Sequence, residues 1–306
     1  MSDEDPEKLI DELISEPEAA AHSEPPPESI HAPAPPETEP ELPPAPPPAV
    51  EPPEPEKTAK PAPQGESWLE TVKTIVYALL IALVIRTFLF QPFNIPSGSM
   101  EATLLVGDYL FVEKFAYGYS RNSFPYSLAP FHGRVFGTQP TRGDVVVFKM
   151  PNKASDHYME DYIKRVIGLP GDKIQMLQGV LYINGKAVPK ERVGDHVETD
   201  EFGLVRHVRQ FKETLPNGKS YLVLDRFMSD FDNTQVFTVP AGDYFMMGDN
   251  RDNSDDSRGD VGYVPAENLV GRAELRFFSI DDTAVWYEPW TWPGAIRFSR
   301  MFTLID

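Results

Sequence analysis

The chain of 306 residues contains no cysteine, and histidine is scarce, with six residues. Without thiols the chain cannot form a disulfide framework, a cysteine-ligated zinc site or a cysteine nucleophile. No histidine lies beside a Gly-x-Ser-x-Gly motif or has the His-x-x-x-His spacing of zinc hydrolases. Any hydrolytic chemistry is therefore expected to need no metal and no other cofactor, and to find its base in another residue type.

An excess of basic residues is also missing, which excludes a typical nucleic-acid-binding surface. The formal net charge is −19, and residues 1–66 hold 17 acidic and three basic residues together with 19 of the 32 prolines. The rest of the chain is close to balanced in charge. A segment as polar as residues 1–66 buries too little apolar surface to offset its ordering entropy. We expect a disordered, acidic, proline-rich tail there, whose partner the sequence does not identify.

One long apolar run interrupts this polar sequence. Twelve uncharged residues, mostly aliphatic, separate Lys73 from Arg86, and the run extends from Trp68 to Phe90 when Arg86 is placed at a boundary. That length meets the roughly 20 residues that a membrane-spanning helix needs. The sequence predicts a transmembrane helix over residues 67–90, with a buried core helix as the alternative.

The charges before this run favour a cytoplasmic N-terminus, because cytoplasmic flanks are enriched in Lys and Arg. The lysines concerned are Lys57, Lys60 and Lys73. Residues 91–306 would then lie outside the cytoplasm. Near the end of the chain, aromatic residues between Val285 and Phe302 could either pack in the core or lie at the membrane interface.

After the apolar run, short strand patterns alternate with Gly, Pro, Asn and Asp, and no long helical periodicity is present. The strongest local signal is Asn184-Gly185, which predicts a hairpin within Gly179–Val188. Further strands are predicted at 145–149, 219–224, 235–239, 244–247 and 270–278. The pattern favours an all-β sandwich or barrel-like domain.

Two segments of this β-rich part hold residues suited to nucleophilic catalysis. Small residues surround Ser99 in Pro96-Ser97-Gly98-Ser99-Met100 and would let a substrate backbone approach closely. A serine nucleophile needs a base, and a lysine can serve when burial lowers the pKa of its amine. Lys164 is the best-placed lysine, because in a strand it would face the core while Arg165 faces solvent. An ordinary edge strand is the alternative for this segment.

A third segment, Gly248–Gly259, is dense with short polar side chains that are typical of turns. From neither candidate starting aspartate does it have the spacing of a calcium-binding loop. A solvated loop is one interpretation of this segment. The other is that Ser254 and the Asp256/Arg258 pair support a buried site.

Together these segments resemble the bacterial type I signal peptidase (leader peptidase) family. The resemblance covers roughly residues 84–279, with an interruption in the middle. It rests on ordered blocks at Ile95–Met100, Thr103–Asp108, Arg142–Phe148, Tyr162–Arg165 with Gly168–Asp172, and Gly248–Ser254 through Arg258.

The resemblance implies a serine endopeptidase that spans the inner (cytoplasmic) membrane once and carries its catalytic domain on the extracytoplasmic side. Its fold would be an all-β catalytic domain, residues 91–306, with a smaller inserted β region at about 173–240. Its partners would be the lipid bilayer and, as substrates, the signal peptides of exported preproteins, cut after small residues in an Ala-x-Ala pattern. An extended substrate would add to a strand edge.

The resemblance also implies roles by position. Ser99 matches the nucleophile and Lys164 the general base. The Ser97 hydroxyl and the Ser99 backbone N–H match an oxyanion hole. Ser254 matches a residue that hydrogen-bonds the lysine amine. Supporting positions are matched by Asp249, Asp256, Arg258, Arg165 and Met100.

One departure and two alternatives accompany this interpretation. Glu101-Ala102 stands where the family often has a proline before Thr103, and we expect only a small change in that turn. Another class of Ser–Lys hydrolase is disfavoured, because Ser99 lacks the Ser-x-x-Lys spacing of penicillin-binding enzymes and the membrane anchor does not suit a self-cleaving repressor. The non-enzyme alternative is an anchored envelope adaptor without catalysis.

Overall fold

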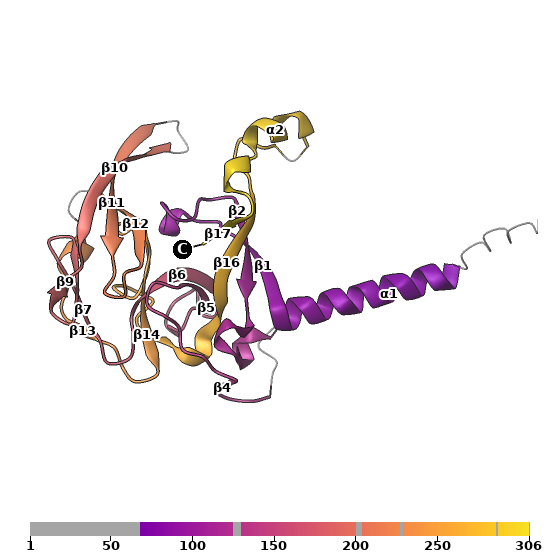
Figure 1. Cartoon of the computed structure of the whole chain (residues 1–306), viewed down its shortest axis with the longest axis horizontal. Helices are drawn as coiled ribbons and strands as arrows, with labels where there is room; N and C mark the ends of the chain where they lie inside the picture. Colours follow the sequence, from indigo (N-terminus) through magenta and orange to yellow (C-terminus); the bar gives the residue numbers. More distant parts are fainter. Residues whose placement is uncertain (1–67, 125–129, 200–203, 227–228, 286, 306) are drawn as a thin grey trace, which may run out of the picture. The chain divides into compact units, whose positions relative to one another are not determined.

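The computed structural model describes residues 68–124, 130–199, 204–226, 229–285 and 287–305 (Figure 1). The expected tail, residues 1–66, lies outside the described residues. All described residues belong to one compact unit, Pro63–Asp306. Within it, one long helix is followed by a chain that is almost entirely β-structure.

Helix α1, Trp68–Val84, continues through a π-helical turn, Ile85–Leu89, so that Trp68–Leu89 provides 22 helical residues. From Ile75 onward the residues of α1 are predominantly apolar on all sides, as is typical of a helix that crosses a membrane. None of this apolar window is buried inside the described structure, which excludes the alternative of a core helix. By length and apolarity it is the one candidate membrane span among the described residues.

Eight strands form the main sheet, in the order β1-β2-β16-β5-β6-β14-β15 with β17 beside β16 (Figure 1). Their bounds are β1 Phe90–Asn94, β2 Asp108–Glu113, β5 Val145–Lys149, β6 Asp161–Gly168, β14 Asp243–Met247, β15 Val264–Pro265, β16 Leu269–Ser279 and β17 Thr303–Leu304. The long strand β16 pairs with both β2 and β5, and its register shifts mark bulges, which bend a sheet. Because β1 starts directly after the helical residues, the edge of this sheet is joined to the candidate membrane helix.

The chain between β6 and β14 forms two smaller sheets, in the orders β13-β7-β8-β9 and β10-β11-β12. Their bounds are β7 Lys173–Leu177, β8 Val180–Ile183, β9 Lys186–Ala187, β10 Lys190–Thr199, β11 Val205–Thr214, β12 Ser220–Asp225 and β13 Phe237–Thr238. Outside these sheets lie the pair β3 Tyr119–Ser120 and β4 Arg134–Val135, and the short helix α2 Trp292–Ala295. The expected fold class, an all-β domain with a smaller inserted β region after an apolar helix, is confirmed.

Strand predictions agree with the structure where the local signal is strong. The β-branched run at 145–149 forms β5. In the predicted hairpin, β8 and β9 flank Asn184 and Gly185, whose φ angles of 54° and 75° are those that a type I′ turn requires. The sequence does not anticipate the β10–β11 pair, because few of its side chains are buried and no continuous apolar face marks it.

The aromatic residues near the end of the chain are not core residues. Trp290, Phe298 and Phe302 are 73%, 66% and 72% exposed. Of the two interpretations of this segment, core packing is therefore wrong for these three side chains. Their exposure leaves a location at the membrane interface as a prediction.

Candidate active site

The turn after β1 is fixed to the main sheet by an aliphatic cluster. Met100 is fully buried within this cluster, which draws on the segment after β1 and on β2, β5 and β16. Its buried members are Ile95, Met100, Leu104, Leu110, Val112, Val145, Val147, Val270 and Ala273. Each of its Val, Leu, Ile and Met side chains contributes roughly 1.5–3 kcal/mol on full burial. The turn therefore sits on a rigid support rather than on a loose loop.

This turn and β6 bring the two candidate catalytic side chains together. Ser99 lies in a 3₁₀ turn, Gly98–Met100, and Lys164 lies on β6. The Lys164 Nζ is 2.9 Å from the Ser99 Oγ, although the two residues are 65 positions apart in the chain. Only 4% of Lys164 and 8% of Ser99 is exposed. This arrangement has the geometry of a nucleophile beside its base.

Burial changes the pKa of this amine. Desolvation lowers the pKa of Lys164 to about 8, although the nearby carboxylates of Asp256, Asp255 and Asp249 act in the opposite direction. The carbonyl oxygen of Ile163 accepts a second hydrogen bond from Nζ at 3.0 Å. A pKa near 8 leaves part of the amine neutral at pH 7, as a general base requires.

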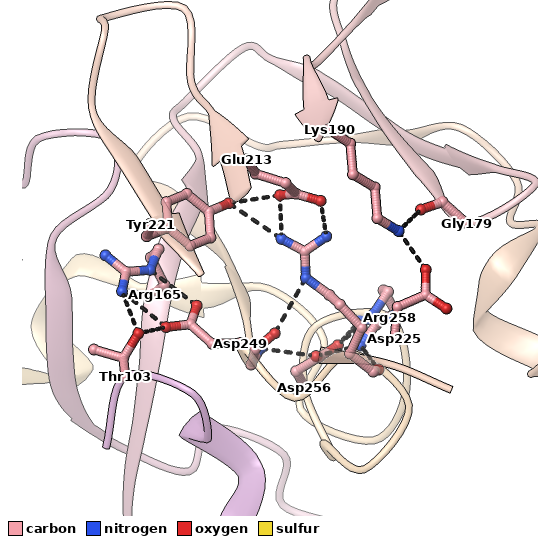
Figure 2. A network of polar contacts seen from close by, with 12 residues as sticks. Thr103, Arg165, Gly179, Lys190, Glu213, Tyr221, Asp225, Asp249, Asp256 and Arg258 are labelled. Atoms are coloured by element: carbon pink, nitrogen blue, oxygen red, sulfur yellow. Dashed lines mark hydrogen bonds and ion pairs between the residues drawn. The ribbon is translucent and has the colours of Figure 1, made fainter. Parts of the chain in front are cut away.

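The expectation that Arg165 faces solvent is wrong, because Arg165 is fully buried. Alternation along β6 does separate it from Lys164, but the inserted region covers the second face of the strand. The guanidinium lies 4.1 Å from the ring centroid of Tyr221 on β12. Its Nε and Nη2 donate to the Asp249 carboxylate at 2.9 and 2.8 Å, and the Thr103 hydroxyl donates to the same carboxylate at 2.5 Å (Figure 2).

A buried ion pair fixes the loop that follows β14. Arg258 donates from Nε and Nη2 to the Asp256 carboxylate at 2.9 and 2.7 Å. The backbone N–H of Gly248 donates to the same carboxylate at 3.0 Å. Burial by itself would raise the pKa of Asp256, but Arg258 and these hydrogen bonds hold it below its usual value. The carboxylate therefore stays charged and ties the start of the loop to its end.

Ser254 lies beside the turn Gly98–Met100, which carries Ser99 and is called the serine turn below. Gly248 packs against both. A Cβ atom on Gly248 would come within 2.2 Å of the Ser254 Oγ and 2.6 Å of the Ser99 carbonyl oxygen, so only glycine fits there. The Ser254 Oγ is buried and has no hydrogen-bond partner among the described residues. The hydrogen bond to the Lys164 amine that the resemblance implies is therefore not formed in this structure.

Asn250, which was not predicted as a site residue, joins this loop to the turn that carries Ser99. Its backbone N–H donates to the carbonyl oxygen of Ser99 at 3.1 Å, and its Nδ2 donates to the carbonyl oxygen of Gly98 at 3.1 Å. Its position inside the block Gly248–Ser254 is the only sequence signal that could have found it. Which member of such a polar block reaches a partner about 150 positions away depends on the fold.

A second buried ion pair joins the loop to the inserted region. Arg251 donates to both carboxylate oxygens of Glu213, at 2.6 and 2.5 Å. The Tyr221 hydroxyl donates to the same carboxylate at 2.9 Å (Figure 2). Glu213 is fully buried and Arg251 is 2% exposed. No local pattern on β11 distinguishes Glu213 from its exposed charged neighbours, so this pair could not be predicted from the sequence.

Ser97 flanks the nucleophile on its other side. It is exposed and extended, with φ −133° and ψ 152°, which leaves its side chain accessible to a bound substrate.

Glu101-Ala102, where the sequence departs from the family pattern, follows Met100 directly, and the peptide bond between these two residues is cis. No group of three or more His, Asp or Glu side chains within the described ranges could hold a metal ion.

Comparisons with known proteins identify the family of this chain. The family model described as "Signal peptidase, peptidase S26" matches residues 68–278. A signal peptidase I of Rickettsia typhi is 42% identical over 259 residues, which cover 76% of this chain and 94% of that protein. A signal peptidase I of Rickettsia akari is 44% identical over 246 residues, which cover 74% of this chain and 89% of that protein. The crystal structure of a signal peptidase I from Enterococcus faecalis V583 has 29% sequence identity to this chain. The match covers 44% of this chain and 97% of that chain, with a TM-score of 0.26.

The family model covers more than half of the chain, and the relatives exceed 40% identity over nearly their whole length. An anchored adaptor without catalysis does not fit these matches. The chain belongs to the signal peptidase I family of serine peptidases, family S26.

Proposed function

We propose that this chain is a membrane-anchored signal peptidase that uses Ser99 as nucleophile and Lys164 as general base. The observation that carries the proposal is the buried 2.9 Å contact between the lysine Nζ and the serine Oγ. When the amine is neutral, its lone pair accepts the serine proton as Oγ attacks the scissile carbonyl. The ammonium then donates a proton to the leaving amine, and the amine later activates water for deacylation.

The oxyanion of the tetrahedral intermediate would be held by the Ser99 backbone N–H and the Ser97 hydroxyl. Ser97 supports this role because it is exposed, has an extended backbone and directly precedes the serine turn. Loss of one such donor typically costs about 2.7–4 kcal/mol of barrier. Ser97→Ala should therefore lower kcat roughly 10²–10³-fold with little change in KM, and an unchanged kcat would remove Ser97 from the proposal.

An open strand edge beside the lysine supports binding of an extended peptide. β6 pairs with β5 over Asp161–Arg165, whereas in the described structure β14 pairs with β6 only from Arg165 to Gly168. The half of β6 that ends at Lys164 therefore has one edge free. In a peptide added there, the first and third residues before the cut would face the same surface. This geometry supports a preference for small residues at both positions, as in Ala-x-Ala.

The chain order supports a site close to the bilayer. The membrane helix ends at Leu89, and the serine turn follows directly after β1. The lysines before the helix favour a cytoplasmic N-terminus. We therefore place the catalytic domain on the extracytoplasmic side of the cytoplasmic membrane, where exported precursors present their cleavage sites.

Precursor cleavage by the purified full-length chain in detergent tests the proposal. The wild type should release the mature product after an Ala-x-Ala sequence, whereas Ser99→Ala and Lys164→Ala should fall to the uncatalysed rate while unfolding at temperatures like that of the wild type. Lys173→Ala, an exposed lysine on β7, is the matched control and should cut normally. Near-normal turnover by Lys164→Ala would mean that another group is the base.

A further inference from the structure

A basic cavity lies at the end of the membrane helix, formed by residues other than those assigned to catalysis. Its volume is about 620 Å³, and its walls come from the last turns of the helix, from β1, β5, β6 and β16, and from the segment after β2. Its charged lining side chains are Arg86, Lys114, Lys149 and Asp161. The proposed reaction uses none of the four, so their assembly needs another explanation.

The cavity has more positive than negative charge. Lys149 and Asp161 form an ion pair with a 2.9 Å contact, and the lining holds no second carboxylate for Arg86 and Lys114. Lys114 is only 2% exposed, and its ammonium donates to the carbonyl oxygen of Ser123. Burial, followed by the positive charge of Arg86, lowers the pKa of Lys114 to about 8. Cations held this close in a partly closed site are stabilised by a bound anion.

The position along the helix points to the kind of anion. Trp68–Leu89 has 22 residues, which at 1.5 Å per residue give a length of about 33 Å. The hydrocarbon core of a bilayer is about 30 Å thick. Among the lining residues, Arg86 and Thr87 lie within about 5 Å of the end of this span, so the long Arg86 side chain can extend to the lipid headgroups. The cavity meets the membrane where phospholipid phosphates are found.

Asn122 adds an acceptor to this lining. Its Nδ2 donates to the carbonyl oxygen of Glu267 at 3.0 Å, whereas its Oδ1 is buried and has no partner among the described residues. A buried amide oxygen of this kind is satisfied when a ligand hydroxyl donates to it. A headgroup with both a phosphate and a hydroxyl would match the two polar features of the cavity.

We propose that this cavity binds the headgroup of an anionic phospholipid of the phosphatidylglycerol type. The phosphate diester lies among Arg86, Lys114 and Lys149, and a glycerol hydroxyl donates to the Asn122 amide oxygen. The proposal requires the helix to span the membrane and is independent of the Ser99–Lys164 chemistry. Its consequence is a lipid-dependent attachment of the main sheet to the bilayer surface.

Thermal unfolding of the full-length chain in uncharged detergent tests lipid binding directly. We expect short-chain phosphatidylglycerol to raise the unfolding midpoint saturably, and phosphatidylcholine of the same chain length to have no such effect. Arg86→Gln and Lys149→Gln should each weaken the apparent affinity about tenfold. Both replaced side chains are partly or fully exposed, so the variants should fold. Lys186→Gln, an exposed lysine on β9, is the matched control and should respond like the wild type.

Four results would overturn the proposal or part of it. Equal midpoint shifts with phosphatidylglycerol and phosphatidylcholine, or an unchanged affinity in both Gln variants, would refute the site. A shift by inorganic phosphate as large as that by the lipid would refute a lipid as the occupant. Phosphatidylmethanol carries the same charge but no headgroup hydroxyl and should bind more weakly, so equal binding would refute the role of Asn122.

Discussion

Replacing Lys164 by methionine should abolish cleavage and at the same time stabilise the folded chain at neutral pH. The side chain is 4% exposed, and its burial lowers the pKa from 10.5 to about 8. At about 1.4 kcal/mol per pH unit, that gap corresponds to about 3 kcal/mol of folding free energy. Methionine has a similar length and no charge, so it removes this cost. The lost hydrogen bonds to Ser99 and Ile163 make 3 kcal/mol an upper limit for the gain.

The pH dependence of this gain follows from proton linkage. The pKa of Lys164 in the folded state lies below its value in the unfolded chain. Between about pH 8 and pH 10.5 the unfolded chain therefore binds more protons at this site, and the stability of the wild type rises with pH. Below pH 8 the full cost is present, and above pH 10.5 it disappears. The advantage of Lys164→Met should therefore be largest at pH 7 and shrink across that window.

Urea unfolding of the full-length chain in detergent micelles, followed by circular dichroism of the β domain at pH 7, 9 and 10.5, measures this difference. Lys173→Met, at an exposed position on β7, is the control and should change stability little at any of these pH values. A Lys164→Met variant that is less stable than the wild type at pH 7 would refute the reasoning. So would a gain that stays constant from pH 7 to pH 10.5, because the cost would then not arise from the proton.

Three further predictions follow from the site. The kcat/KM for a peptide substrate should rise about tenfold per pH unit to a break near pH 8, because only neutral Lys164 accepts the serine proton; a break near pH 6.5 would indicate a histidine base. Gly248→Ala should lower kcat on the order of 100-fold, since the new Cβ displaces the serine turn, whereas Gly194→Ala, with open space around it, should cut normally. Glu213→Gln should destabilise the chain by about 3–5 kcal/mol in urea unfolding, because Arg251 is left as an uncompensated buried charge; combining Glu213→Leu with Arg251→Met should restore most of that loss, and no restoration would contradict the ion-pair explanation.

Elements with strong local chemistry could be predicted from the sequence. The β-branched run of β5 and the Asn184-Gly185 hairpin depend on backbone preferences that neighbouring residues impose. The β10–β11 pair could not be predicted in this way, because few of its side chains are buried and the pairing depends on contacts between segments. The burial of the aromatic residues near the end of the chain could not be predicted either, because composition does not determine which side chains pack against other segments.

Burial on both faces of β6 explains why the prediction that Arg165 faces solvent is wrong. Alternation correctly separates Arg165 from Lys164, but alternation cannot say what covers each face. The inserted region supplies Tyr221 against the guanidinium, and the loop after β14 supplies Asp249. Tyr221 and Asp249 both lie far from β6 in the sequence. The residues around β6 alone therefore cannot predict that Arg165 is buried.

The sequence by itself determined which residues could do the chemistry: a serine among small residues, a lysine in an apolar strand and a polar block with its own ion pair. Those are local properties of composition and order. Only the tertiary structure decided that Ser99 and Lys164 lie 2.9 Å apart and that the lysine is desolvated enough for its pKa to fall to about 8. Desolvation requires surrounding side chains from strands far apart in the chain, and packing alone provides them.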